Sequence, residues 1–186
     1  MNDIIIAGIG GQGNILLSRV ICQLFMNRGF DVKSAENIGM SQRGGSVVSY
    51  IRVGDEVGPI VPDGKADILI GLEMSEAARN VNKINKDSVV VLNNKFVRPK
   101  NSDLKKQEIL NLIESNISKF YILNAYDIAL ELDMPKAENI TMLTLICKKE
   151  IFPFSKEEIM TALKLVLSPQ MYEMNKILVE KIYEKY

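Results

Sequence analysis

Near the start of the chain stands Asp3-Ile4-Ile5-Ile6-Ala7-Gly8-Ile9-Gly10-Gly11-Gln12-Gly13, the stretch that most clearly indicates a fold class. Its first residues form a continuous apolar run, which is typical of a strand covered on both faces. Gly8, Gly10 and Gly13 follow with G-x-G-x-x-G spacing, and a helical pattern over residues 13–27 begins at once. Such a turn exposes backbone N–H groups at a helix N-terminus, which favours a bound phosphate or carboxylate.

Strand and helix patterns alternate along the chain outward from this turn. We expect the first strand at residues 3–8, further strands at residues 31–35, 46–53, 57–61, 66–71, 88–93 and 119–123, and further helices at residues 73–81 and 103–117. This order predicts an α/β, Rossmann-like fold with a mostly parallel sheet, flanking helices and a C-terminal helical extension. We expect a single domain over residues 1–186, with an α/β core at 1–124 and a helical tail at 125–186. A break at residues 151–155 suits either a hinge or a helix end followed by a capping box at Ser155.

The composition limits the classes of function. The chain has 23 basic and 23 acidic residues, and its zero net charge gives no electrostatic footprint for nucleic acid. It lacks an apolar run long enough to span a membrane and a secretion signal pattern, so we expect a cytoplasmic protein with no nucleic-acid and no membrane partner. There is no histidine, and Cys22 and Cys147 stand far apart in helical patterns. Histidine-based catalysis is excluded, and no metal or iron–sulfur site is expected on this chain alone.

The glycine turn has two interpretations. It either cradles an anion, with Gly10 and Gly11 admitting the ligand, or it is a tight connection that binds nothing. A dinucleotide fold also needs an acidic residue near the end of its second strand to hold the ribose. Glu36, twenty-three positions after Gly13, is the candidate. A stand-alone dinucleotide-binding oxidoreductase is therefore one hypothesis for this chain.

A second glycine-containing cluster begins at Glu36. It reads Glu36-Asn37-Ile38-Gly39-Met40-Ser41-Gln42-Arg43-Gly44-Gly45-Ser46 and combines one cation, side-chain amides and three glycines. Arg43 offers a planar fork of donors to a carboxylate or phosphate, and Gly44 and Gly45 permit the close approach of a ligand or another backbone. Because ligands of doubly wound sheets bind at the carboxyl ends of the strands, we expect both glycine clusters at the same sheet edge.

Other charged residues have simpler interpretations. Glu73 and Glu76 lie in the first turn of a predicted helix, where carboxylates interact favourably with the helix dipole, so we interpret them as structural rather than as a paired acid site. Lys95 and Arg98 suit either an anionic partner or an exposed loop.

Together, Gly8-Ile9-Gly10-Gly11-Gln12-Gly13 and Glu36-x-x-Gly39-Met40-Ser41-Gln42-Arg43-Gly44-Gly45-Ser46-Val47 resemble the gamma-type domain of the 2-oxoacid:ferredoxin oxidoreductases. The likeness is greatest to the short beta subunits of the indolepyruvate branch. It continues through Ile60-x-Pro62-x-Gly64-x-Ala66-Asp67 and, more loosely, into residues 137–145. The chain departs from the family at Asn37-Ile38, where Thr-His is frequent, and at Thr144, where glycine is usual.

The resemblance implies a subunit that is inactive alone and that helps an assembled enzyme to decarboxylate aryl-2-oxoacids oxidatively. Coenzyme A is a substrate of that complex, and ferredoxin is its electron acceptor. Thiamine diphosphate and the iron–sulfur clusters are expected on a partner alpha subunit, so this chain should hold no cofactor alone and no catalytic residue. On this resemblance residues 10–13 and 42–46 face the ligand or the partner. The full set of cofactor-binding candidates is Gly8, Gly10, Gly11, Gln12, Gly13, Glu36, Gln42, Arg43, Gly44, Gly45 and Ser46.

Two alternatives stay open beside the dinucleotide hypothesis. The chain could be a subunit that serves another 2-oxoacid. It could also be an assembly module whose glycine turns only pack against a partner. In that last case, replacing Gly11 or Arg43 would weaken assembly without changing the Michaelis constant for coenzyme A.

Overall fold

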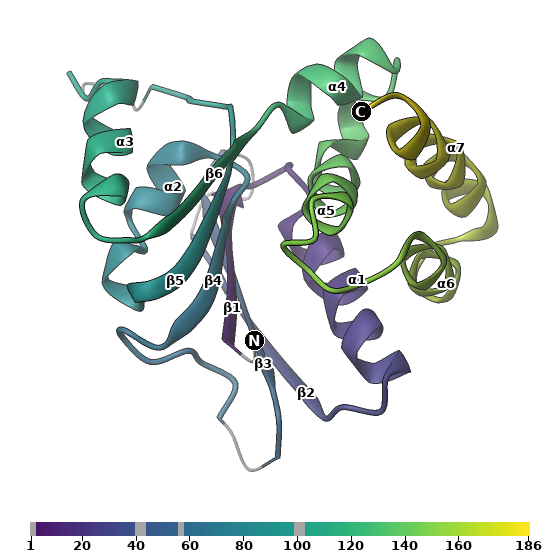
Figure 1. Ribbon diagram of the computed structural model, residues 1–186, viewed down its shortest axis with the longest axis horizontal. Coiled ribbons are helices and arrows are strands. Elements are labelled where there is room, and N and C mark those ends of the chain that lie inside the picture. The colour runs from purple at the N-terminus through teal and green to yellow at the C-terminus, as the bar shows by residue number, and fades with distance from the viewer. Residues whose placement is uncertain (1–2, 40–43, 56–57, 99–102) are drawn as a thin grey trace.

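A six-stranded sheet forms the centre of the computed structural model, which describes residues 3–39, 44–55, 58–98 and 103–186 (Figure 1). The strand order is β2-β3-β1-β4-β5-β6. The strands are β1 (Asp3–Ile9), β2 (Val32–Ile38), β3 (Ser46–Val53), β4 (Ala66–Gly71), β5 (Ile84–Asn93) and β6 (Lys119–Leu123). Neighbours from β1 through β4 and β5 to β6 pair in parallel, whereas β3 pairs antiparallel with both β1 and β2. The predicted α/β fold with a mostly parallel sheet is confirmed.

The antiparallel strand β3 follows from the length of its connection. Residues 39–45 alone join β2 to β3, and a parallel crossover needs a dozen or more residues. Three strand predictions need correction. The strand expected at 88–93 begins earlier, at Ile84. The second strand continues beyond residues 31–35 to Ile38. The strand predicted at 57–61 is wrong over its described residues 58–61, where Pro59 removes a backbone donor from any ladder.

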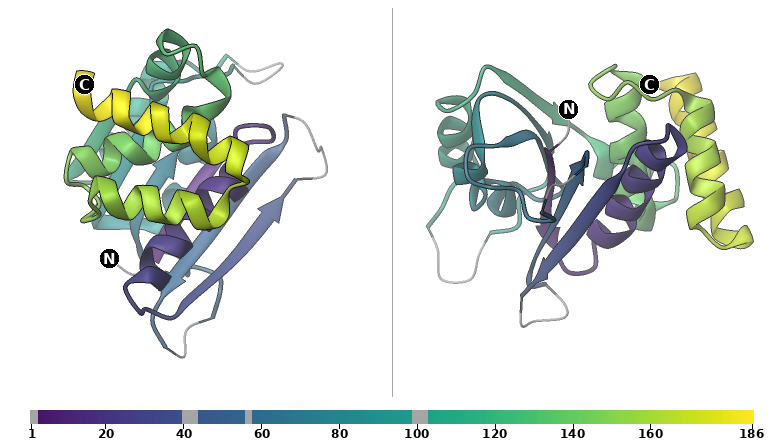
Figure 2. Two further views of the ribbon diagram at one scale, coloured as in Figure 1. Left: turned by 90° about the vertical axis from the view of Figure 1, so that its right-hand side faces the viewer. Right: turned by 90° about the horizontal axis from the view of Figure 1, so that it is seen from below.

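Helices cover both faces of the sheet, α2 and α3 on one face and α1 with α5 on the other (Figures 1 and 2). The helices are α1 (Asn14–Asn27), α2 (Met74–Ala78), α3 (Lys106–Glu114), α4 (Ala125–Glu131), α5 (Glu138–Lys148), α6 (Lys156–Val166) and α7 (Pro169–Lys185), with 3-10 turns η1 (Val81–Lys83) and η2 (Pro135–Ala137). Helices α2 and α3 are both shorter than predicted. The helical pattern after residue 124 is confirmed, with α6 and α7 forming an outer layer over α1 and α5.

The alternation of side chains along β1 divides the interior into two cores. Ile4 and Ile6 face the cluster that includes α1 and the tail helices, which we call the tail-side core. Ile5 and Ala7 face the cluster under α2 and α3, which we call the opposite core. Both arise because successive strand residues point to opposite faces.

The segment at residues 151–155 is packed rather than hinged. Phe152 and Phe154 are buried in the tail-side core, and their rings stand edge to face with centroids 6.1 Å apart. Ser155 then caps α6: its hydroxyl accepts the Glu158 backbone N–H, and the Glu158 carboxylate accepts that of Ser155. The capping box is confirmed, and the buried Phe152 and Phe154 rings argue against the hinge interpretation.

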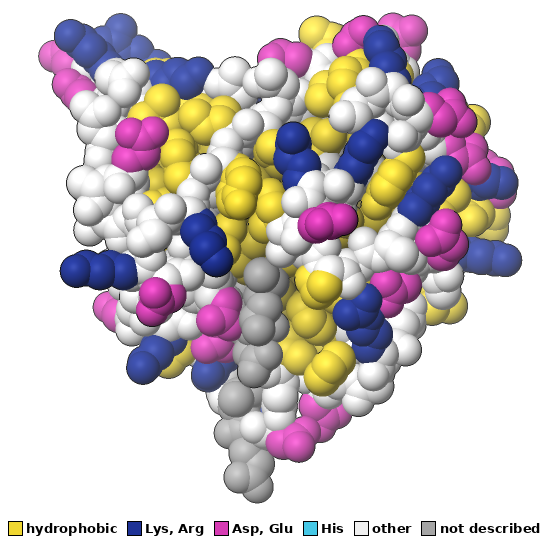
Figure 3. Space-filling view, in the orientation of Figure 1, with side chains coloured by type: hydrophobic (Ala, Val, Ile, Leu, Met, Phe, Trp, Pro, Cys, Tyr) yellow, Lys and Arg dark blue, Asp and Glu magenta, His cyan; other side chains and the backbone are white. Residues whose placement is uncertain are grey.

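The described helices and the face shown in Figure 3 bear on membrane spanning and on charge distribution. Within the described ranges, no helix combines the length and apolar character that a bilayer crossing requires. On the face shown in Figure 3, acidic and basic side chains are interspersed with apolar atoms.

Candidate functional site

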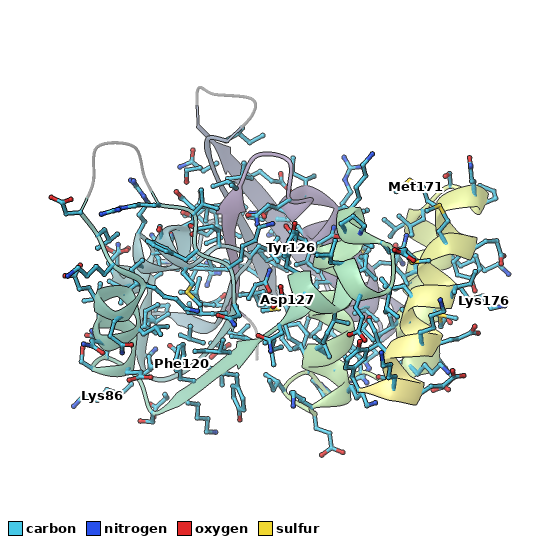
Figure 4. All side chains as sticks on the ribbon, turned by 90° about the horizontal axis from the view of Figure 1, so that it is seen from above. Lys86, Phe120, Tyr126, Asp127, Met171 and Lys176 are labelled. Carbon is cyan, nitrogen blue, oxygen red and sulfur yellow. The ribbon has the colours of Figure 1, made fainter. Side chains whose placement is uncertain are left out.

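The candidate site lies where the parallel strands end. Strands β1, β4 and β5 finish at Ile9, Gly71 and Asn93, and each is followed by a turn at the same edge of the sheet. Figure 4 looks onto this edge from above and labels Tyr126, a residue of α4. Ligands of open α/β sheets usually bind at this edge.

The two glycine clusters meet here through their backbones. The N–H of Gly10 donates to the carbonyl of Gly45 at 2.8 Å, and the N–H of Gly44 donates to the carbonyl of Gly10 at 3.3 Å. Ser46, the first residue of β3, stands opposite Ile9 in the β1–β3 ladder. The expected proximity of the two clusters is therefore observed. Gln42 and Arg43, which were also expected at the site, lie outside the described residues.

The glycines of the first turn serve two different purposes. A Cβ on Gly13 would lie 2.4 Å from Nδ2 of Asn139, and one on Gly8 would lie 2.6 Å from Oδ1 of Asn14, so both positions need glycine for close packing. Gly11 differs because a Cβ there would meet nothing within 4 Å, although its φ of +101° still disfavours other residues. Gly11 is thus the exposed member of the turn, open to a ligand or a partner.

Gln12 points into the protein. It is 7% exposed, its Oε1 accepts the Ile9 N–H at 2.8 Å, and its Nε2 donates to the Leu72 carbonyl at 3.1 Å and to Oε1 of Glu138 at 3.0 Å. These bonds use both amide hydrogens and the oxygen. Gln12 therefore anchors the turn and offers no free side-chain group to a ligand.

Glu36 is not placed where a dinucleotide-binding fold needs it. It lies within β2, is exposed and pairs with Ser49 of β3. Strand β3 stands between β2 and β1, so the acidic residue is one strand away from the glycine turn. In the usual arrangement the strand carrying the ribose-binding acid neighbours β1. This separation argues against the dinucleotide hypothesis.

A groove runs along the outside of the glycine turn. It has a volume of about 510 Å³. The groove is lined by Ile9, Gly10, Gly11, Gly13, Asn14, Ile15, Ile38 and Val47. Aliphatic side chains and glycine backbone predominate, and this described lining includes no cation. The groove therefore suits a neutral segment of a ligand, with any anion-binding side chain supplied from beyond this lining.

Helix α1 begins beside this groove. Its N-cap is Gly13, no side chain of the described residues caps it, and its first turn carries no acidic residue. The Asn14 amide is also only half used, because Nδ2 donates to the Val47 carbonyl at 2.7 Å while the buried Oδ1 has no hydrogen-bond partner in the described structure. An uncapped N-terminus can accept an anion through its backbone N–H groups.

Sequence reasoning missed Glu138, the first residue of α5. Its Oε2 accepts a bond from Nζ of Lys95 at 2.7 Å, and its Oε1 accepts the bond from Gln12. We call Gln12, Lys95 and Glu138 the Glu138 junction. Lys95, interpreted from the sequence as a loop or partner-binding cation, also lies 4.1 Å from the ring centroid of Tyr126. No motif spacing connects these residues, since they come from three distant segments.

Glu73 forms a second buried acidic position at the same edge. Its carboxylate caps α2 by accepting the Glu76 N–H at 3.0 Å, and it accepts the Val97 N–H at 2.8 Å. Burial raises the pKa of Glu73 above its ordinary value. The structural interpretation of Glu73 is confirmed by this capping geometry.

The sequence profile of the pyruvate ferredoxin/flavodoxin oxidoreductase family matches residues 3–185. The chain belongs to this family. Curated relatives include the indolepyruvate oxidoreductase subunit IorB of Archaeoglobus fulgidus, 30% identical over 93% of this chain and 89% of the relative. The IorB of Methanothermobacter thermautotrophicus is 32% identical over 93% of this chain and 91% of its own length. The family resemblance predicted from the two glycine clusters is confirmed, and the chain is of the oxidoreductase-subunit type.

Solved structures share the fold of this family member. The pyruvate oxidoreductase subunit PORC of Thermotoga maritima superposes with a TM-score of 0.69 at 18% identity, covering 98% of this chain and 95% of that one. The 2-oxoglutarate:ferredoxin oxidoreductase of Magnetococcus marinus, solved with 2-oxoglutarate, coenzyme A and succinyl-CoA, gives a TM-score of 0.71 at 17% identity. This chain is covered completely there but accounts for 32% of that longer chain. At these identities the likeness concerns the fold.

Proposed function

We propose that this chain is the beta, gamma-type subunit of a cytoplasmic indolepyruvate-type 2-oxoacid:ferredoxin oxidoreductase. Its partner is an alpha subunit that carries thiamine diphosphate and iron–sulfur clusters, and ferredoxin accepts the electrons of the complex. The observation that carries this proposal is the likeness to IorB subunits along nearly the whole chain. A subunit serving another 2-oxoacid remains the alternative to be tested.

The side chains of this protein suit a supporting role. The chain has no histidine, and its two cysteines lie on different helices, Cys22 in α1 and Cys147 in α5. Burial raises the pKa of the Cys22 thiol to about 11 and that of Cys147 to about 12, so neither is readily available as a thiolate ligand or nucleophile. These properties support a partner that holds the redox centres.

The groove beside Gly11 is the proposed contact region for coenzyme A. The pantetheine arm of that substrate is neutral and contains amides, which match aliphatic walls and glycine backbone groups. The uncapped start of α1 offers N–H donors to a charged group, and Arg43 is proposed to add a cation from the neighbouring cluster. In this proposal Gly10, Gly11 and residues 42–46 shape the site, and no side chain of this subunit performs the chemistry.

Reconstitution tests the proposal. The chain is co-expressed with a cluster-bearing alpha subunit from the same genome, and reduction of a viologen is followed with coenzyme A and indolepyruvate, pyruvate or 2-oxoglutarate. We expect reduction only when both chains and coenzyme A are present, and fastest with indolepyruvate. Activity of a loaded alpha subunit without this chain would overturn the proposal, and faster turnover of another acid would favour the alternative.

A charge variant examines the contact region. Arg43→Ala is expected to raise the KM for coenzyme A with less effect on kcat, because the cation would act in binding. Arg19→Ala is the matched control, since Arg19 is an exposed residue of α1 beyond its first turn. If Arg43→Ala weakens assembly but leaves this KM unchanged, the glycine clusters act only as an assembly module.

A further inference from the structure

Three contacts set the direction of the Gln12 amide, and Glu138 provides the only one of them that comes from a side chain. On one side the amide oxygen of Gln12 accepts the Ile9 N–H, and on the other its NH₂ group donates to Leu72 and Glu138. A flipped amide would place NH₂ against the N–H of Ile9 and oxygen against the carbonyl of Leu72. The Glu138 carboxylate, which is acceptor-only when ionised, favours the observed direction.

The same helix holds the turn at a second point. Asn139, next to Glu138 in α5, donates from Nδ2 to the Gly13 carbonyl at 3.1 Å. Asn139 is 2% exposed and Glu138 is 4% exposed, so neither contact competes freely with water. Two consecutive residues of the tail therefore bind the glycine turn: Glu138 accepts from the Gln12 side chain, and Asn139 donates to the carbonyl of Gly13, the N-cap of α1.

The junction also reaches the loop after β5. Lys95 supplies the cation that pairs with Glu138, and its backbone carbonyl accepts the Met74 N–H at 3.1 Å. A buried carboxylate without a partner is costly, whereas a charge-assisted bond stabilises it. The position of Glu138, and through it the direction of Gln12, is thus set jointly by the tail and by the loop after β5.

We propose that Glu138 is a positioning residue: by bonding Gln12 and Lys95 together, it fixes the conformation in which Gly10 and Gly11 present their backbone to the groove. This inference concerns the turn itself. Its consequence for coenzyme A rests on the proposed function.

Replacing Glu138 by glutamine should disturb the turn whichever way the new amide points. Its oxygen can accept from Gln12 or from Lys95, but its NH₂ group then faces the other donor. Adding Lys95→Met removes that second donor, so the amide oxygen can serve Gln12 alone. The double variant should therefore restore the turn that the single variant disturbs, although it contains one more substitution.

Amide hydrogen exchange of the full chain, resolved by residue with NMR, measures this effect. The reporters are the N–H groups of Ile9, Gly10 and Gln12, which donate to Gln12 Oε1, Gly45 and Ile9 respectively. We expect Glu138→Gln to speed their exchange by about tenfold, in line with loss of one bond to a charged group, and Lys95→Met/Glu138→Gln to return it toward the native rate. Glu173→Gln, an exposed residue of α7, is the control and should leave the rate unchanged.

Unchanged exchange at all three reporters in a folded Glu138→Gln chain would overturn the inference. So would a double variant that exchanges faster than both single variants. If Glu138→Gln does not fold, the double variant decides, because the proposal requires its exchange at the three reporters to stay near the native rate.

The reconstituted complex supplies a separate readout. With the turn mispositioned, Glu138→Gln should raise the KM for coenzyme A several-fold more than it lowers kcat, and the double variant should recover that KM. A native complex without activity would refute the proposed function and leave the exchange result standing. Altered exchange with an unchanged KM would confine the role of Glu138 to the turn and overturn its consequence for coenzyme A.

Discussion

Glu138 on the tail side of the sheet and Glu73 on the α2 side are both buried at the carboxyl edge, and their carboxylates are stabilised differently. Glu138, from the tail side, pairs with Lys95 at 2.7 Å and orients Gln12. Glu73, from the α2 side, accepts the backbone N–H groups of Glu76 and Val97. Glu73 thus organises its own helix start, whereas Glu138 connects three distant segments. The helical tail therefore takes part in building the glycine site.

The cores beneath these residues differ in the same way. The tail-side core is continuous from Ile4 in β1 through α1 to Phe152 and to Ile182 in α7. The opposite core under α2 and α3 is smaller and ends with those helices. A tail that shares its core with the sheet should unfold together with it.

The largest effect is expected from Phe152→Ala. Removing this side chain from the tail-side core should lower the free energy of unfolding by about 3–5 kcal/mol. Urea unfolding followed by circular dichroism and tyrosine fluorescence should show one shared transition at lower urea. Leu165→Ala, 62% exposed on α6, is the control and should change stability by less than about 0.5 kcal/mol. Two separate transitions would refute the expectation that the tail unfolds together with the sheet, because the tail would then be an independent folding unit.

The next largest effect is a difference in stability cost between alanine substitutions at two glycines of the same turn. Gly11→Ala and Gly13→Ala both place a side chain at positive φ, which costs about 1–2 kcal/mol. Gly13→Ala should cost more, because its Cβ would meet Asn139 Nδ2 at 2.4 Å, whereas Gly11 faces open space. Thermal unfolding measures the difference. In an Asn139→Ala background the additional cost of Gly13→Ala should shrink; a cost that stays the same would show that the tail contact is not its cause.

A smaller effect is expected in the pH dependence of the free energy of unfolding, to which Glu73 contributes. Burial raises its pKa above the ordinary 4.5, so the folded chain holds this proton more tightly than the unfolded chain. Its contribution to stability should fall as pH rises from 4.5 through the raised folded pKa, and then level off. Glu73→Gln cannot ionise and should flatten this fall in urea unfolding measured from pH 4.5 to about 8. Glu173→Gln should retain the native slope, and a Glu73→Gln slope equal to native would refute the assignment.

The smallest effect concerns the thiols of the tail-side core. With pKa values near 11 and 12, Cys22 and Cys147 should react with iodoacetamide about tenfold or more slowly in the folded chain than in urea. Peptide mass spectrometry resolves the two sites. Cys22 should label before Cys147, because Cys147 is 4% exposed and Cys22 only partly buried. Labelling of Cys147 at the unfolded rate would show that the tail does not close over this core.

Local patterns in the sequence were sufficient for much of this fold. The apolar run before Gly8 predicts β1, the spacing through Gly13 predicts the turn into α1, and Ser155 with Glu158 predicts the start of α6. These predictions succeed because the determining interactions join residues only a few positions apart. The same patterns misjudged residues 58–61, where Pro59 lacks a ladder donor, and extended α2 beyond its last residue, Ala78.

The alternation of elements, the two glycine clusters and, through the resemblance they carry, the family follow from local sequence patterns. The contacts that those clusters make follow only from the folded chain. Strand β3 inserts between β2 and β1 and removes Glu36 from the turn, and Glu138 reaches Gln12 across 126 positions of sequence. The difference lies in the sequence separation of the interacting residues. Helix caps and apolar strand runs depend on residues a few positions apart, whereas the partners of a buried carboxylate come from distant segments that the packed core brings together.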